Sequence, residues 1–76
     1  MNFKLTHPLF PDTKIGEIYR QKIGNREIKL VGYGKDCIFF EHREFEFSGM
    51  VGNGEFIRVT DFKLFSSVYK KVDYED

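Results

Sequence analysis

The sequence lacks several features that define familiar classes of small protein. It holds one cysteine, Cys37, which excludes an internal disulfide and a cysteine-rich zinc site. No apolar run approaches the ~20 residues that a membrane-spanning helix needs, and there is no secretory signal. We therefore expect a cytoplasmic protein without a metal or a cofactor, in which Cys37 is a buried and unreactive thiol.

An excess of charge of one sign is also missing, since 12 basic and 12 acidic side chains give a formal net charge of zero. Non-specific nucleic-acid binders need surplus positive charge to neutralise phosphates. The distribution is nevertheless uneven: residues 1–35 carry seven basic and three acidic side chains, and residues 36–61 carry two and six. The fold can therefore present a basic and an acidic face, unless neighbouring strands pair these charges.

Aromatic residues, by contrast, are abundant. They make up 17% of the 76 residues, and nine of them are Phe, although there is no Trp. A chain of this length forms one domain with a marginal core, which a few buried Phe side chains can stabilise. So many aromatics in so short a chain also favour some of them being exposed for a partner.

The densest block of β-branched and aromatic residues spans residues 27–41 and contains a turn at residues 34–36. This composition predicts the central hairpin of a sheet. The apolar alternation changes phase between Leu30 and Val31, just before Gly32. That change predicts a β-bulge or a sharp bend in the first strand of the hairpin.

Shorter patterns on both sides complete an all-β prediction: a small SH3-like antiparallel barrel of about five strands over residues 14–72, with one helical turn near the C-terminus. Thr60 or Asp61 is the expected helix cap. The expected elements are an N-terminal arm (1–13), a strand (14–23), a two-residue hairpin loop (24–25), two strands (26–33 and 37–43), a half-buried edge strand (44–48), a mobile glycine loop (49–54), a strand (55–60), a helical turn (62–67), a closing strand (68–72) and an acidic tail (73–76).

Several of these features resemble small uncharacterised phage and prophage proteins with SH3-like barrels. They are Gly16 and Tyr19, the Gly24–Asn25 hairpin, Val31, the turn at residues 34–36, Phe62, and the closing Tyr69, Lys70, Lys71 and Val72. The segment at residues 41–54 departs from the shortest of these proteins. The resemblance implies a viral or mobile-element accessory protein that acts by binding.

Catalytic chemistry has few candidate groups. His42 lies among carboxylates, but residues adjacent along a strand point to opposite faces, so His42 cannot share a face with Glu41. Cys37 and His42 are five positions apart and fail as a nucleophile–base pair for the same reason. One imidazole with carboxylates is also a poor closed metal site. We predict a protein that is not an enzyme.

The favoured function is protein binding through an acidic, aromatic surface that selects a basic partner and can modulate or inhibit a host protein. The alternative for the same segment is an edge strand kept soluble by its acids, with Phe45 and Phe47 in the core. The candidate residues are Glu41, Glu44, Phe45, Glu46, Phe47, Met50 and Val51.

The second hypothesis is nucleic-acid binding by a basic face on the first two strands, beside Tyr19 and Tyr33. Small barrels bind single strands in this way, with basic side chains on the backbone and aromatic rings under the bases. The basic candidates are Arg20, Lys22, Arg26 and Lys29. The sequence also leaves a homodimer open, because exposed strand edges or the apolar arm can pair two copies.

Overall fold

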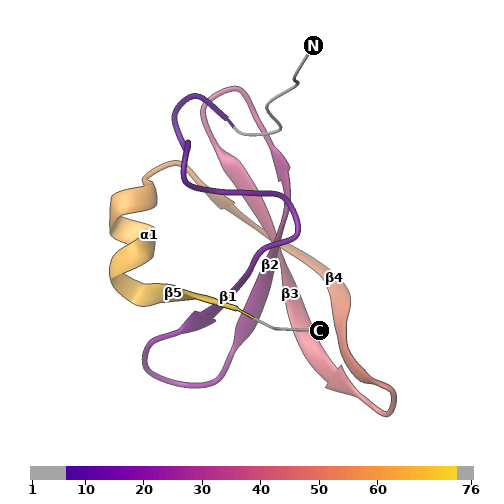
Figure 1. Ribbon diagram of the computed structural model, residues 1–76. Helices are drawn as coiled ribbons and strands as arrows, with labels where there is room; N and C mark the ends of the chain where they lie inside the picture. Colours follow the sequence, from indigo (N-terminus) through magenta and orange to yellow (C-terminus); the bar gives the residue numbers. More distant parts are fainter. Residues whose placement is uncertain (1–6, 74–76) are drawn as a thin grey trace.

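The β-branched and aromatic runs form five antiparallel strands and one helix in the computed structural model, which describes residues 7–73 (Figure 1). The strands are β1 (Ile18–Gln21), β2 (Glu27–Tyr33), β3 (Ile38–Glu46), β4 (Gly49–Val59) and β5 (Tyr69–Val72), and the helix is α1 (Phe62–Val68). The sheet order is β4-β3-β2-β1-β5. The predicted mostly-β antiparallel fold with a short C-terminal helix is confirmed.

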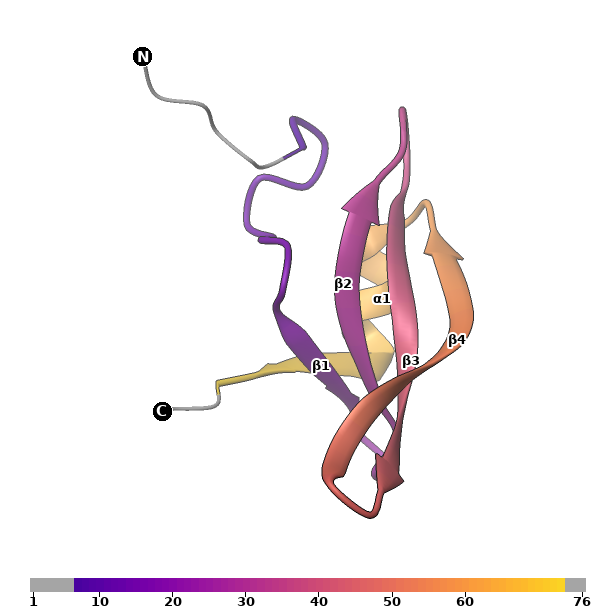
Figure 2. The same cartoon turned by 90° about the vertical axis from the view of Figure 1, so that its right-hand side faces the viewer.

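The sheet is open rather than closed over the described residues. β4 and β5 form its two edges, and no pairing joins them within residues 7–73. Closure into an SH3-like barrel is therefore not shown, although β4 bends strongly along its length (Figure 2).

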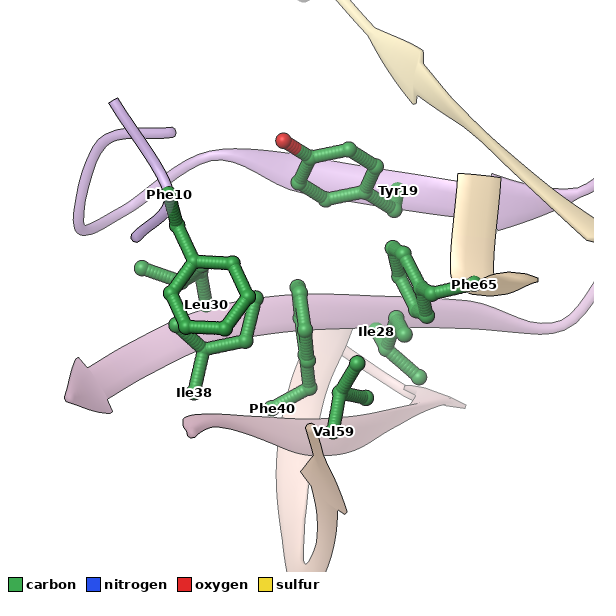
Figure 3. Close-up of a cluster of buried hydrophobic side chains, with 8 residues drawn as sticks. All are labelled: Phe10, Tyr19, Ile28, Leu30, Ile38, Phe40, Val59 and Phe65. Atoms are coloured by element: carbon green, nitrogen blue, oxygen red, sulfur yellow. The ribbon is translucent and has the colours of Figure 1, made fainter. Parts of the chain in front are cut away.

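The core lies between one face of the sheet and α1 (Figures 1 and 3). Alternation in β2 and β3 places Ile28, Leu30, Ile38 and Phe40 on this face, each with 0% of its surface exposed. Phe65 of α1 stacks on Phe40 with ring centroids 4.6 Å apart. The remaining members of the cluster are Phe10, Tyr19 and Val59.

The N-terminal arm contributes directly to the core through Phe10, which is only 4% exposed (Figure 3). A turn holds it in place, because the Phe10 amide donates to the His7 carbonyl and the Thr13 hydroxyl donates to the Phe10 carbonyl. Residues 1–6 of the predicted arm and residues 74–76 of the predicted tail lie outside the described residues.

Asp61 caps α1, as one of the two predicted caps. Its Oδ1 accepts the Leu64 amide at 3.1 Å, which satisfies one of the free N–H groups of the first turn. At seven residues, α1 is short, and no helix among residues 7–73 is long and apolar enough to cross a membrane.

The bulge in β2 is confirmed by a register shift between Leu30 and Gly32 against β3. The prediction for the first strand was too long. Residues 14–17 form a turn instead, because Gly16 adopts a φ of +99° and the Glu17 carboxylate accepts the Lys14 amide at 2.6 Å.

The connection from β1 to β2 is also longer than the predicted two-residue loop, and spans residues 22–26. Gly24 has the predicted positive φ, at +111°, but Asn25 does not. The Lys22 amide donates to the Val68 carbonyl at 2.8 Å, which draws the chain toward the end of α1 before it turns back.

The predictions of a separate strand over residues 44–48 and of a loop over residues 49–54 were wrong. The expected separate edge strand over residues 44–48 is largely the continuation of β3, and the expected glycine loop over residues 49–54 belongs to β4. Together they form a long hairpin that projects beyond the rest of the sheet, at the lower right of Figure 1.

Candidate functional site

The outer half of the β3–β4 hairpin has two chemically different faces. Direct cross-strand pairs are Glu44 with Val51, Phe45 with Met50, and Glu46 with Gly49. Paired residues share a face and adjacent residues do not, so Phe45 and Met50 lie on one face, while both carboxylates and Val51 lie on the other. The register thus separates an apolar face from an acidic one.

The aromatic side chains of this hairpin point to solvent. Phe45 is 80% exposed and Phe47, in the turn, is fully exposed. Both were expected to point inward if the segment were a half-buried edge strand, and that interpretation is wrong. Phe45 lies five positions after the buried Phe40 on the same strand, so it faces away from the core, and Phe47 lies in the turn at the end of the projecting hairpin (Figure 1).

A bulge bends β4 where the hairpin leaves the body. The pairing register of β3 with β4 shifts between Glu41 and Arg43. The Glu41 carboxylate accepts a hydrogen bond from the Gly54 amide at 3.1 Å. Asn53 donates from Nδ2 to Glu44 at 2.9 Å, and its Oδ1 accepts the Glu55 amide at 2.9 Å. Glu41 therefore supports the bend, whereas no hydrogen bond or ion pair within residues 7–73 is recorded for the Glu46 carboxylate.

Below the bulge, ion pairs fix the root of the hairpin. The Glu27 carboxylate is buried and accepts Arg43 at 2.9 Å on one oxygen and Arg20 at 2.7 Å on the other. Arg43 also donates to the Met50 carbonyl at 3.3 Å, which links the body to β4. Hydrogen bonds between charged groups are stronger than those between neutral groups, and here one carboxylate bridges two arginines. The hairpin is thus anchored at its base.

A groove of about 400 Å³ lies alongside this anchor. Phe45 and Met50 supply its apolar wall, and Arg26 approaches His42 at 3.4 Å on its polar side. The full lining is Asn25, Arg26, His42, Arg43, Glu44, Phe45, Met50 and Asn53.

The basic candidates do not form one face. Arg20 is committed to Glu27, and Lys29 lies on the same outer face of the sheet, opposite Glu41 in register. Arg26 lines the groove beside the hairpin, whereas Lys22 lines a different cleft next to α1. Strand pairing has therefore placed these four positive charges in three separate surroundings.

The residues considered for catalysis are Cys37 and His42. Cys37 is buried, as expected, and His42 faces Arg26 in the groove. Within residues 7–73, no group of three or more His, Cys, Asp or Glu side chains is placed to hold a metal ion.

Tyr19 and Lys71 both have a shifted pKa, and both interact with the Glu17 carboxylate. Burial, together with the neighbouring Glu17 carboxylate, raises the pKa of the Tyr19 phenol above its ordinary range. A hydrogen bond to the same carboxylate, with an Nζ–Oε2 distance of 3.0 Å, raises the pKa of the Lys71 ammonium. Neither shift produces a nucleophile, because both groups are held more firmly in their protonated forms.

Sequence reasoning missed two further exposed groups. Phe56 of β4 is 62% exposed on the outer face, and the exposed Lys70 of β5 lines the same cleft as Lys22. The alternation around Phe56 correctly separated its face from that of Ile57 and Val59, but it did not show which of the two faces is buried. Nothing local in the sequence indicates that Lys22 and Lys70 line one cleft.

No protein-family model, no curated protein and no solved structure matches this chain, so the geometry of its hairpin and clefts is the ground on which function is argued.

Proposed function

We propose that this protein is a non-enzymatic protein-binding module whose contact surface is the outer half of the β3–β4 hairpin. The observation that carries the proposal is the exposure of Phe45 and Phe47, at 80% and 104%, on a projecting hairpin. Burying two such rings against a partner gains roughly 1.5–3 kcal/mol each. Aromatic side chains of this kind dominate the energetics of protein interfaces.

The charge of the hairpin selects the partner. Between Arg43 and Arg58 the chain carries three acidic side chains, Glu44, Glu46 and Glu55, and no basic one. A basic surface is its electrostatic complement, and such complementarity mainly raises the association rate and rejects wrong partners. The resemblance to small phage proteins favours a host protein in this role, modulated or inhibited by occupation of its basic surface.

The same charge argues against self-association through this surface. Two copies facing each other by their hairpins would bring like charges together, which opposes contact. The groove beside the hairpin supports binding of a different protein. Its apolar wall of Phe45 and Met50 can receive an apolar side chain next to the acidic face.

The direct test compares proteins captured from a lysate of the source organism by three tagged forms. They are the wild type, the double variant Phe45→Ser with Phe47→Ser, and a control, Leu9→Ser with Leu64→Ser, which removes two apolar side chains of 63% and 66% exposure elsewhere. We expect a partner that the wild type and the control retain and the hairpin variant loses. Equal capture by the hairpin variant would refute the proposal.

A further inference from the structure

The outer face of the sheet, opposite the core, is an exposed surface separate from the tip of the hairpin. α1, the one helix of residues 7–73, covers the core side and lies behind the sheet in Figure 2, where the outer face of β2 and β3 is turned to the viewer. Strand pairing aligns a row of side chains across this face, with Lys29 opposite Glu41 and Glu41 opposite Phe56. The next row places Phe39 opposite Arg58. Basic and aromatic side chains from three strands are therefore neighbours on the outer face.

This face carries an excess of positive charge in a chain of zero net charge. By register and alternation, five basic side chains of the strands lie on it, together with Glu27 and Glu41. Asp36, in the turn before β3, adds a third acidic group at 3.7 Å from Arg58, so five basic side chains stand against three acidic ones. The basic residues are Arg20, Lys29, Arg43, Arg58 and Lys70.

Three of these basic side chains present their charge to solvent. Lys29 and Lys70 are exposed, and neither forms a side-chain ion pair within residues 7–73. Glu41, the cross-strand neighbour of Lys29, directs its carboxylate to the backbone of β4 instead. The Arg58 side chain is 60% exposed, and its separation from Asp36 is long for an ion pair. An anionic ligand can therefore reach all three positive charges.

Phe39 and Phe56 supply aromatic rings beside these charges. Phe56 is 62% exposed and Phe39 is half-buried, and neither ring contacts another ring of residues 7–73. The two residues are diagonal neighbours on β3 and β4, a relation that separates Cα atoms by about 7–8 Å. Gly32 lies opposite Phe39 on the other side, and a Cβ there would meet nothing within 4 Å. The surface next to the rings is thus open to a planar group.

We propose that the outer face of the sheet binds a segment of single-stranded nucleic acid. Bases stack on Phe56 and Phe39, and Lys29 and Arg58 hold the phosphates beside them. Sheets that bind RNA use exposed aromatic rings in this way, and basic side chains follow the backbone. The rings favour nucleic acid over an acidic protein segment, because every base has a flat face that can stack. The inference does not depend on the hairpin function, because none of these four residues belongs to residues 44–51.

The test is the binding of a fluorescent oligothymidylate at low salt, followed by anisotropy. Lys29→Ala with Arg58→Ala removes two phosphate contacts, so it should weaken binding and reduce the slope of log K against log salt by about 1.4. Lys22→Ala with Lys63→Ala removes the same charge from the side of α1 and should change the affinity little. Asp36→Asn should strengthen binding, because it removes the acidic neighbour of Arg58. Absence of saturable binding by the wild type overturns the proposal, as does an equal loss in the two double variants.

The aromatic rings are tested by a second pair of variants. Phe56→Leu keeps an apolar side chain but removes the ring, and should weaken binding about tenfold, since stacking of one base contributes of that order. Phe56→Tyr keeps a ring and should retain the wild-type affinity. Binding by Phe56→Leu that equals the wild type would overturn the proposal, because the bases would then make no contact. Inorganic polyphosphate that displaces the oligonucleotide at an equal concentration of phosphate would overturn it in the same way.

Discussion

Glu27 on β2 and Arg43 on β3 lie directly opposite each other in register and form an ion pair with a 2.9 Å separation. The same row continues through Arg20 to Lys70 on one side and to Gly52 on the other. One buried carboxylate thus links the two arginines at the root of the hairpin. The body of the sheet and the candidate binding surface are connected through this row.

Removing that carboxylate charge should destabilise the fold. Glu27→Gln leaves the Arg43 guanidinium, whose side chain is 17% exposed, without its counter-charge, and breaking a buried pair costs roughly 3 kcal/mol. Urea denaturation gives the free energy of unfolding. Arg58→Ala is the matched control, because its pair with Asp36 is long at 3.7 Å and exposed, and such pairs contribute about 0–1 kcal/mol. Equal midpoints for the two variants would contradict the assigned role of Glu27.

Adjacent residues of the arm should behave in opposite ways. Phe10→Ala empties a core position, for which the cost is typically about 3–5 kcal/mol, whereas Leu9→Ala at 63% exposure should stay within about 0.5 kcal/mol of the wild type. Thermal and urea unfolding of both variants measures the difference. If Phe10→Ala unfolds like Leu9→Ala, the arm does not contribute to the core.

Two glycines provide a test of the β4 bulge. A Cβ at Gly52 would overlap with the Glu41 carboxylate, whereas a Cβ at Gly32 meets nothing within 4 Å. Gly52→Ala should therefore displace Glu41 from the Gly54 amide and cost about 1 kcal/mol, the value of one hydrogen bond. Gly32→Ala should be neutral or slightly stabilising. Combining Gly52→Ala with Glu41→Ala should recover part of the loss in a double-mutant cycle, and strict additivity would show that the two residues do not interact.

The sequence was sufficient to predict features that depend only on residues close together in the chain. The bulge before Gly32 and the cap at Asp61 each depend on a few neighbouring residues, and both were predicted correctly. The glycines of residues 49–54 lower strand propensity, but pairing with β3 overrides it. A period of two shows that Phe45 and Glu44 point to opposite sides. Because β3 continues without a break from Phe40, Phe45 lies five positions further on and faces away from the core, and the prediction of a separate strand over residues 44–48 concealed this relationship.

The two clefts were beyond sequence reasoning for a different reason. Lys22 and Lys70 line the same cleft because β5 pairs with β1, a contact between segments almost fifty residues apart. Likewise, Arg20 and Arg43 share Glu27 only because β1 and β3 flank β2. Composition indicated that opposite charges on neighbouring strands can pair. Strand order decides which charges are neutralised and which remain available.

Stability should fall in alkaline solution. The pKa values of Tyr19 and Lys71 are both raised in the folded state, so above about pH 10, where these groups ordinarily titrate, the folded state holds more protons than the unfolded one. Their contributions are complete below that pH and are lost as pH rises through the folded-state values. Urea midpoints measured from pH 8 upward should decline beyond pH ~10, and Tyr19→Phe should decline less. An unchanged decline in Tyr19→Phe would exclude the phenol as a source.

Charge reversal on the hairpin should separate recognition from folding. Glu44 and Glu46 are exposed, so Glu44→Lys with Glu46→Lys should change the free energy of unfolding by no more than about 1 kcal/mol. Binding to a basic partner should nevertheless be lost, because two attractive charges become repulsive ones. Asp36→Lys with Asp73→Lys changes the net charge equally from positions outside the hairpin, and should leave capture intact. Raised salt should weaken the wild-type complex, since interactions between exposed charges are screened. A partner that binds the reversed hairpin with unchanged affinity and salt dependence would show that the acidic face takes no part in selecting it.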